Sequence, residues 1–296
     1  MTSAPSGLGR SAVPDGLLLV GHGSRSDAGA TEMRALAQLV GDALPDVAVD
    51  VGFLEMTDPP AGPVLDRLAA AGCGRVVVLP LVLLGAGHAK SDVPALVLEA
   101  RQRHPDLHVH FGSPLGITRE LVEVLGGAVN AAGGAGLPLL VVARGTSDPD
   151  ANGDAHKVTR LLGEWVGAPF VHTAFTGVTA PTVPDGLDVF ARLGHRRMAV
   201  AFWFLCTGVL VERARTEVAA FSAATGVDVV DAGYLGADSR LVPAIVERYR
   251  EAGRGIPAVN CDLCAYRAPW PGREDRQGQP IGVGHSHLAA EHRHQH

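Results

Sequence analysis

The second half of this 296-residue chain repeats the first, and this duplication limits the possible folds more than any other feature of the sequence. When Leu140 is placed on Leu18, similar segments coincide over the length of a domain. One pair is GHGSRSD with ARGTSDPD, and another is GCGRVVVLPLVLL with GHRRMAVAFWFLC. The duplication predicts two copies of one fold in tandem. A hydrophobic fraction of 47% is ample for two packed cores.

Within the first copy, short apolar runs typical of buried strands alternate with amphipathic segments typical of helices. The expected strands are 17–21, 47–54, 76–83 and 107–111, and the expected helices are 32–44, 61–71, one after Ser91, and 118–130. Such alternation is typical of parallel strands joined by right-handed crossovers. The predicted fold class is therefore α/β, with two tandem similar domains, each a small parallel sheet flanked by helices.

The segment AAGGAG at 131–136 indicates a linker between the copies. We expect a disordered N-terminus at 1–13, an active domain at 14–133, a degenerate copy at 137–253 and a flexible tail at 254–296. The N-terminus lacks the apolar core of a secretory signal, and no segment approaches the roughly 20 apolar residues of a membrane span. These features, with only four cysteines, predict a cytoplasmic protein. A net charge of −6 without a run of Lys or Arg argues against nucleic acid or membrane as a partner.

Three polar residues of the first copy follow successive strands and are absent from the second copy. His22 follows the first strand, Glu55 ends the second, and His88 follows the third. The matching residues of the second copy are Arg144, Gly177 and Leu210. Because the carboxyl ends of parallel strands share one edge of a sheet, the three side chains can meet there. Two imidazoles and a carboxylate suit Fe, Co, Ni or Zn, and a histidine can also accept protons near neutral pH. Each residue alone has an ordinary explanation as a polar loop residue, and the site rests on the three together.

The motifs LLLVGHGSR, VGFLEMTDP and LPLVLLGAGHAKSDVP, in this order, resemble those of the sirohydrochlorin chelatases. This class II family inserts cobalt or ferrous iron into a modified tetrapyrrole. The resemblance is strong over the first half and weaker over the second, where it rests on the duplication. It implies a long two-domain chelatase-like fold with one working site in the cleft between an active and a degenerate half.

The resemblance also implies roles for single residues. It assigns the metal site to His22, Glu55 and His88, and proton acceptance to His22. It implies that the tetrapyrrole pocket is lined by Leu83, Leu84, Gly85, Ala86, Gly87 and His88. Since sirohydrochlorin carries many carboxylates, a basic rim is expected, and Arg25, Lys90 and Arg144 are candidates by position.

Two C-terminal features remain open. Cys261 and Cys264 form a single CxxC, which is a weak zinc signal. The resemblance to long cobalt-type members implies an iron–sulfur cluster or redox site there, with an inert thiol pair as the alternative. The tail GHSHLAAEHRHQH could bind Co, Ni or Zn loosely, or be simply solvated. No dinucleotide fingerprint or GK[ST] motif is present, so neither NAD nor ATP is expected.

The expected function is insertion of a divalent metal into sirohydrochlorin, in cobalamin or siroheme biosynthesis. Cobalt is favoured because of the long C-terminal extension, and ferrous iron is the close alternative. A non-catalytic metal-delivery protein that uses the tail and the CxxC is a different possibility. A small-molecule enzyme that uses His22 as a base without metal is another. The sequence leaves open whether the protein is a monomer or a homodimer.

Overall fold

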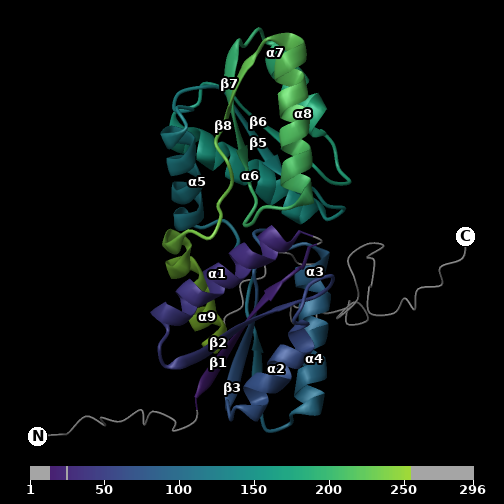
Figure 1. The fold of residues 1–296 in the computed structure, drawn as a ribbon, viewed down its shortest axis with the longest axis vertical. Coiled ribbons are helices and arrows are strands. Elements are labelled where there is room, and N and C mark those ends of the chain that lie inside the picture. Colours follow the sequence, from purple (N-terminus) through teal and green to yellow (C-terminus); the bar gives the residue numbers. More distant parts are fainter. Residues whose placement is uncertain (1–13, 25, 255–296) are drawn as a thin grey trace, which may run out of the picture.

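The computed structural model describes residues 14–24 and 26–254 and contains two four-stranded parallel sheets (Figure 1). The strand order is β2-β1-β3-β4 in the first sheet and β6-β5-β7-β8 in the second. The strands of the first sheet are β1 Asp15–Gly21, β2 Val47–Phe53, β3 Arg75–Pro80 and β4 His108–Phe111. Those of the second sheet are β5 Leu139–Ala143, β6 Val171–Phe175, β7 Arg197–Phe202 and β8 Asp228–Asp231. The predicted fold class is therefore confirmed.

The central strand β1 explains the apolar run at its position in the sequence. It pairs with β2 on one side and with β3 on the other, and both of its faces are buried. Because successive side chains of a strand point to opposite faces, the run divides between two cores. Leu18 and Val20 belong to an outer core, whereas Leu17 and Leu19 belong to a core that also contains Leu139 of the second sheet. One continuous apolar layer thus joins the two halves.

Helices cover both faces of each sheet. The first repeat contributes α1 Asp27–Ala43, α2 Ala61–Ala70, α3 Gly87–Lys90, α4 Asp92–Arg103 and α5 Arg119–Ala131. The second contributes α6 Pro149–Val166, α7 Val183–Arg192, α8 Val209–Thr225, the 3₁₀ turn η1 Ser239–Leu241 and α9 Val242–Gly253. The outer faces are covered by α2 and α4 in the first repeat and by α7 and α8 in the second.

The two repeats exchange their last helices (Figure 1). Helix α5 follows the first sheet but packs on α6 and β7, where Gly126 lets the Trp165 ring lie against the α5 backbone. Helix α9 follows the second sheet but packs on α1, β3 and β4. Its Arg248 donates to the Leu115 carbonyl oxygen at 3.1 and 3.2 Å. The sequence units 14–133 and 137–253 are therefore interlocked in space rather than two separate bodies.

Some local details differ from the sequence-based expectation. Strand β3 ends at Pro80 instead of continuing to residue 83, and α1 begins at Asp27, five residues earlier than expected. His88 lies in the short helix α3 instead of a Gly-rich turn. Ser91 occupies the N-cap position of α4, but its hydroxyl donates back to the Gly87 carbonyl oxygen at 2.7 Å and does not cap the helix.

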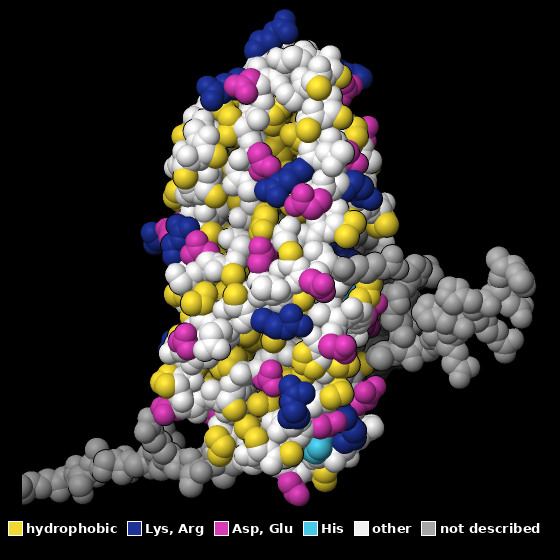
Figure 2. All heavy atoms as spheres, in the orientation of Figure 1, with side chains coloured by type: hydrophobic (Ala, Val, Ile, Leu, Met, Phe, Trp, Pro, Cys, Tyr) yellow, Lys and Arg dark blue, Asp and Glu magenta, His cyan; other side chains and the backbone are white. Residues whose placement is uncertain are grey.

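The surface has a mixed charge pattern. On the face seen in Figure 2, acidic and basic side chains alternate and no extended basic area is visible. This pattern agrees with the modest net charge of −6. None of the helices in the described part of the chain is long and apolar enough to cross a membrane.

Candidate functional site

His22 and Glu55 come together because the backbone pairing of β1 with β2 continues beyond the strands. The last register pair of the ladder is Gly21 with Phe53. Beyond it, the Leu54 N–H donates to the Gly21 carbonyl oxygen at 3.0 Å, and the Glu55 N–H donates to the His22 carbonyl oxygen at 3.1 Å. Both side chains therefore start from one rim of the first sheet.

Gly23 permits this close approach of the two loops. Its φ is +96°, a conformation that L side chains rarely adopt. A Cβ atom there would lie 1.8 Å from the Glu55 carbonyl oxygen. A residue larger than glycine at this position would have to move Glu55.

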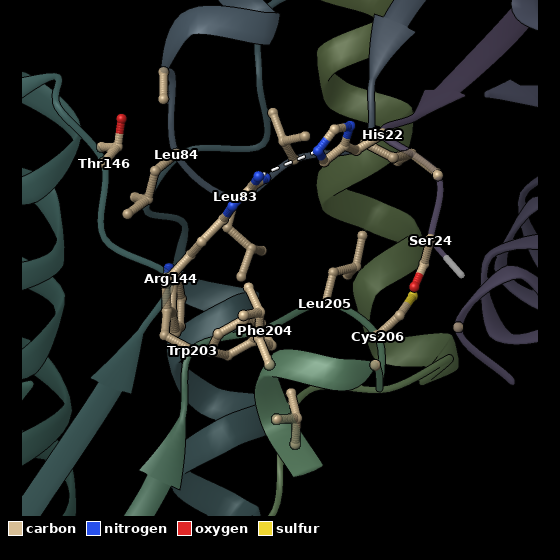
Figure 3. Close-up of a pocket in the computed structure, with 18 of the residues that line it drawn as sticks. His22, Ser24, Leu83, Leu84, Arg144, Thr146, Trp203, Phe204, Leu205 and Cys206 are labelled. Atoms are coloured by element: carbon tan, nitrogen blue, oxygen red, sulfur yellow. Dashed lines mark hydrogen bonds between the residues drawn. The ribbon is translucent and has the colours of Figure 1, made fainter. Parts of the chain in front are cut away.

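The His22 imidazole has a different neighbour on each ring nitrogen, and Figure 3 shows the one at Nε2, Arg144. Its buried Nδ1 lies 3.3 Å from Glu55 Oε1, and its Nε2 lies 3.2 Å from a guanidinium nitrogen of Arg144. Because a guanidinium only donates hydrogen bonds, Nε2 is the acceptor, and the ring proton belongs on Nδ1, facing Glu55. His22 is thus a neutral imidazole with a fixed tautomer.

Arg144 lies in the loop after β5, at the position that matches His22 in the other repeat. The residue is exposed on the side that faces the first repeat, while its guanidinium is partly buried. Burial lowers the pKa of Arg144, and the nearby Glu55 carboxylate acts in the opposite direction. The guanidinium keeps its charge at neutral pH, because arginine does not deprotonate in proteins.

His88 and Lys90 both lie on α3, directly after the third strand's loop. The His88 side chain is outside the described residues. Lys90 Nζ lies 2.8 Å from Asp148 Oδ2 and 3.2 Å from Asp150 Oδ2, with 13% of the side chain exposed. Burial of Lys90 lowers its pKa, but the two carboxylates outweigh this effect and the pKa is raised overall. Lys90 therefore connects α3 to the second repeat. Its place in a basic rim for the ligand stays a prediction.

The expected three-ligand site stays a prediction. Among the residues that the structure describes, no group of three His, Cys, Asp or Glu side chains is arranged to hold a metal ion. That set does not include the His88 side chain. Arg25, Cys261, Cys264 and the histidine-rich tail also lie outside the described residues.

A cavity of about 480 Å³ lies between the repeats, with His22 and Arg144 in its wall (Figure 3). The wall is mostly apolar. The chain after β3 contributes residues 81–84 and Ala86, and the chain after β7 contributes residues 203–211. Leu83 and Leu84 therefore line this cavity, and their contact with a tetrapyrrole stays a prediction. The two repeats supply matching stretches of chain to opposite walls.

Two further wall residues were not anticipated from the sequence. Trp203 is 3% exposed, and within the described residues its buried indole N–H has no hydrogen-bond partner. Met56 has a φ of +56° and a side chain that is 60% exposed. The duplication carries a signal for Trp203, since it matches Leu81 in the wall formed by the first repeat. Nothing in the sequence distinguishes Met56 except that it follows Glu55.

Two matching α/β repeats, whose strand ends face a shared cavity, define a two-domain chelatase-like protein. The structure of SirB from Bacillus subtilis with Fe³⁺ superposes with a TM-score of 0.73 at 26% identity, covering 82% of this chain and 97% of that one. The CbiX family model matches residues 16–132 and again residues 138–252. The chain belongs to the CbiX family.

Two curated relatives carry functional names. The sirohydrochlorin cobaltochelatase of Priestia megaterium is 34% identical over 258 residues, which cover 85% of this chain and 84% of the relative. The sirohydrochlorin ferrochelatase of the same organism is 28% identical over 225 residues, which cover 75% of this chain and 84% of the relative. The suspected family resemblance is therefore confirmed.

Proposed function

We propose that this protein is a cytoplasmic enzyme that inserts a divalent metal ion, with Co²⁺ favoured, into sirohydrochlorin. The observation that carries the proposal is the His22 ring, whose Nε2 faces an apolar cavity while its Nδ1 faces Glu55. The relative that is 34% identical bears the name of a cobaltochelatase, which supports the choice of substrate and metal.

The chemistry needs a neutral imidazole. Insertion removes water from the ion and two protons from pyrrole nitrogens, so a ligand that binds moderately and a base near neutral pH are both useful. In the proposal, His22 Nε2 binds the metal ion or accepts a pyrrole proton. Glu55 orients the ring through Nδ1. A carboxylate behind a histidine ligand fixes the tautomer and makes the ring a better ligand. His88, on α3 at the same rim, is proposed as the second imidazole.

The cavity suits a flat apolar macrocycle with charged edges. A volume of about 480 Å³ lies within the range of ordinary small-molecule sites. The leucines after β3 and the aromatic residues after β7 would contact the two faces of the ring. Arg144 would meet one of the acidic groups at its edge.

Ferrous iron is the second candidate metal. The relative named as a ferrochelatase is 28% identical, and the donors proposed here suit several divalent ions. Cells choose among such ions by availability as well as by affinity. We therefore assign cobalt as the favoured metal and iron as the alternative.

The test is an anaerobic absorbance assay with sirohydrochlorin and either Co²⁺ or Fe²⁺. We expect His22→Ala to slow insertion about a hundredfold or more, the loss typical of a missing base or ligand. The matched control is His104→Ala, since His104 pairs with Asp66 at 2.7 Å on the outer surface. Equal rates for His22→Ala and the control would contradict the proposal.

A metal-delivery protein without catalysis would behave differently in the same assay. Ending the chain after Ile256 removes the CxxC and the histidine-rich tail. A chelatase should keep its insertion rate, whereas a delivery protein should lose most of its bound metal. Retained metal binding without insertion in the full chain would favour the second function.

A further inference from the structure

Arg144 and His22 hold matching positions in the two repeats and meet across the cleft between them. The 3.2 Å contact joins the guanidinium to Nε2 (Figure 3). The other ring nitrogen, Nδ1, is buried against Glu55. Nε2 is therefore the nitrogen that an ion in the cavity can reach, and Arg144 already contacts it.

One lone pair cannot serve both partners. A metal ion would bind Nε2 through the same lone pair that accepts the hydrogen bond from Arg144. The ion and the guanidinium also repel each other, because both are positive and would lie only a few ångströms apart. Arg144 has to leave Nε2 before an ion can bind there.

An acidic ligand supplies a reason for Arg144 to move. Among the described residues that line the cavity, Arg144 is the one Lys or Arg, and it forms no salt bridge with a described carboxylate. Lys90 in contrast is held by Asp148 and Asp150. A ligand carboxylate can bind a guanidinium through two parallel charge-assisted hydrogen bonds, which are stronger than one bond to a neutral imidazole.

We propose that Arg144 is a gate that makes metal binding depend on the tetrapyrrole. In the free protein its guanidinium covers His22 Nε2. A carboxylate of the bound tetrapyrrole draws the guanidinium away and opens Nε2 to the ion, so that the ion binds tightly only when its acceptor is present. The inference rests on the proposed function and adds an order of binding to it.

The test measures the affinity of the Arg144→Met variant for each of the two ligands separately. This substitution keeps much of the side-chain volume and removes the charge. Binding of Co²⁺ alone is followed by calorimetry, and binding of sirohydrochlorin alone by fluorescence in the presence of a chelator. We expect the variant to bind Co²⁺ about tenfold more tightly, because the repulsion and the competing hydrogen bond are gone. We expect it to bind sirohydrochlorin about tenfold more weakly, because a charge-assisted pair is lost.

Affinities for Co²⁺ and sirohydrochlorin that change in opposite directions distinguish a gate from simple damage to the fold. Damage to the fold would weaken the binding of both ligands. The control is Arg192→Met, since Arg192 pairs with Asp188 on the exposed side of α7 and should change neither affinity. If the Co²⁺ affinity of Arg144→Met does not rise, the gate is overturned. The proposed metal site is still supported in that case if His22→Ala no longer binds Co²⁺. Unchanged Co²⁺ binding in His22→Ala would overturn both the gate and the proposed site.

Discussion

A few single residues distinguish the strand-end rim of the first repeat, which carries His22 and Glu55, from the matching rim of the second. In the first repeat, Gly23 makes room for the Glu55 backbone. In the second, a Cβ atom at Gly177, the match of Glu55, would lie 2.3 Å from the Arg144 carbonyl oxygen. The second repeat has therefore lost the space for a glutamate as well as the glutamate itself.

Replacing Gly23 with alanine tests how the rim is held. Gly72 is a matched control because its φ of +85° is similar to that of Gly23. At Gly72, no atom of the described residues lies within 4 Å of the place that a Cβ would take, whereas Gly23 is crowded by Glu55. We expect Gly72→Ala to lower the free energy of unfolding by about 1 kcal/mol through backbone strain. Gly23→Ala should cost more and should also weaken Co²⁺ binding, as seen by urea denaturation and metal titration. Equal losses in the two variants would show that the contact with Glu55 is unimportant.

At the scale of elements, two sets of polar contacts beside the cavity hold the repeats together. On α1, Glu32 accepts hydrogen bonds from the Thr207 N–H at 2.8 Å and from the Tyr234 hydroxyl at 2.6 Å. On α3, Lys90 binds the start of α6. The helices that follow the first and third strands of the first repeat are thereby fixed against the second repeat.

The contribution of the Tyr234–Glu32 hydrogen bond to stability depends on pH. Burial, with the hydrogen bond to Glu32, raises the pKa of Tyr234 to about 12. The unfolded chain has a tyrosine pKa of about 10, so it loses the proton first as pH rises. The contribution of Tyr234 to stability is therefore complete below about pH 10 and is lost as pH approaches 12. We expect Tyr234→Phe to reduce the fall in stability over this range, measured by denaturation at a series of pH values; an unchanged fall would contradict the assignment.

The sequence predicts those features that arise within one repeat. The meeting of His22 with Glu55 follows from parallel strands, and the apolar runs locate all four strands of the first sheet. Contacts between repeats are not encoded in the periodicity of either one. For that reason the pairing of Lys90 with Asp148 and the contact of Arg144 with His22 emerge only from the structure. The short helix α3 was missed because its Gly-rich sequence favours a turn.

At the scale of the whole molecule, the exchange of α5 and α9 makes the repeats depend on each other. Each sheet has one face covered by a helix from the other repeat, and the core between the sheets is shared. The cavity exists only where the two repeats meet. A half-molecule would expose a large apolar face of its sheet.

Separating the chain within 131–136 tests this dependence. We expect the fragment 1–136 either to remain unfolded or to associate with itself through its uncovered face, because α9 is absent. Adding the fragment 137–296 should restore one cooperative thermal transition in circular dichroism. A stable, folded monomer of 1–136, established by sedimentation, would contradict the mutual dependence of the repeats.

The most direct test of the central claim is to locate the metal ion itself. Crystals grown with Co²⁺ and sirohydrochlorin, and measured at the cobalt absorption edge, would give an anomalous peak at the bound ion. We predict this peak within bonding distance of His22 Nε2, at the cavity wall, with the Arg144 guanidinium moved to a substrate carboxylate. A peak elsewhere in the molecule, with Arg144 still on His22, would contradict the claim.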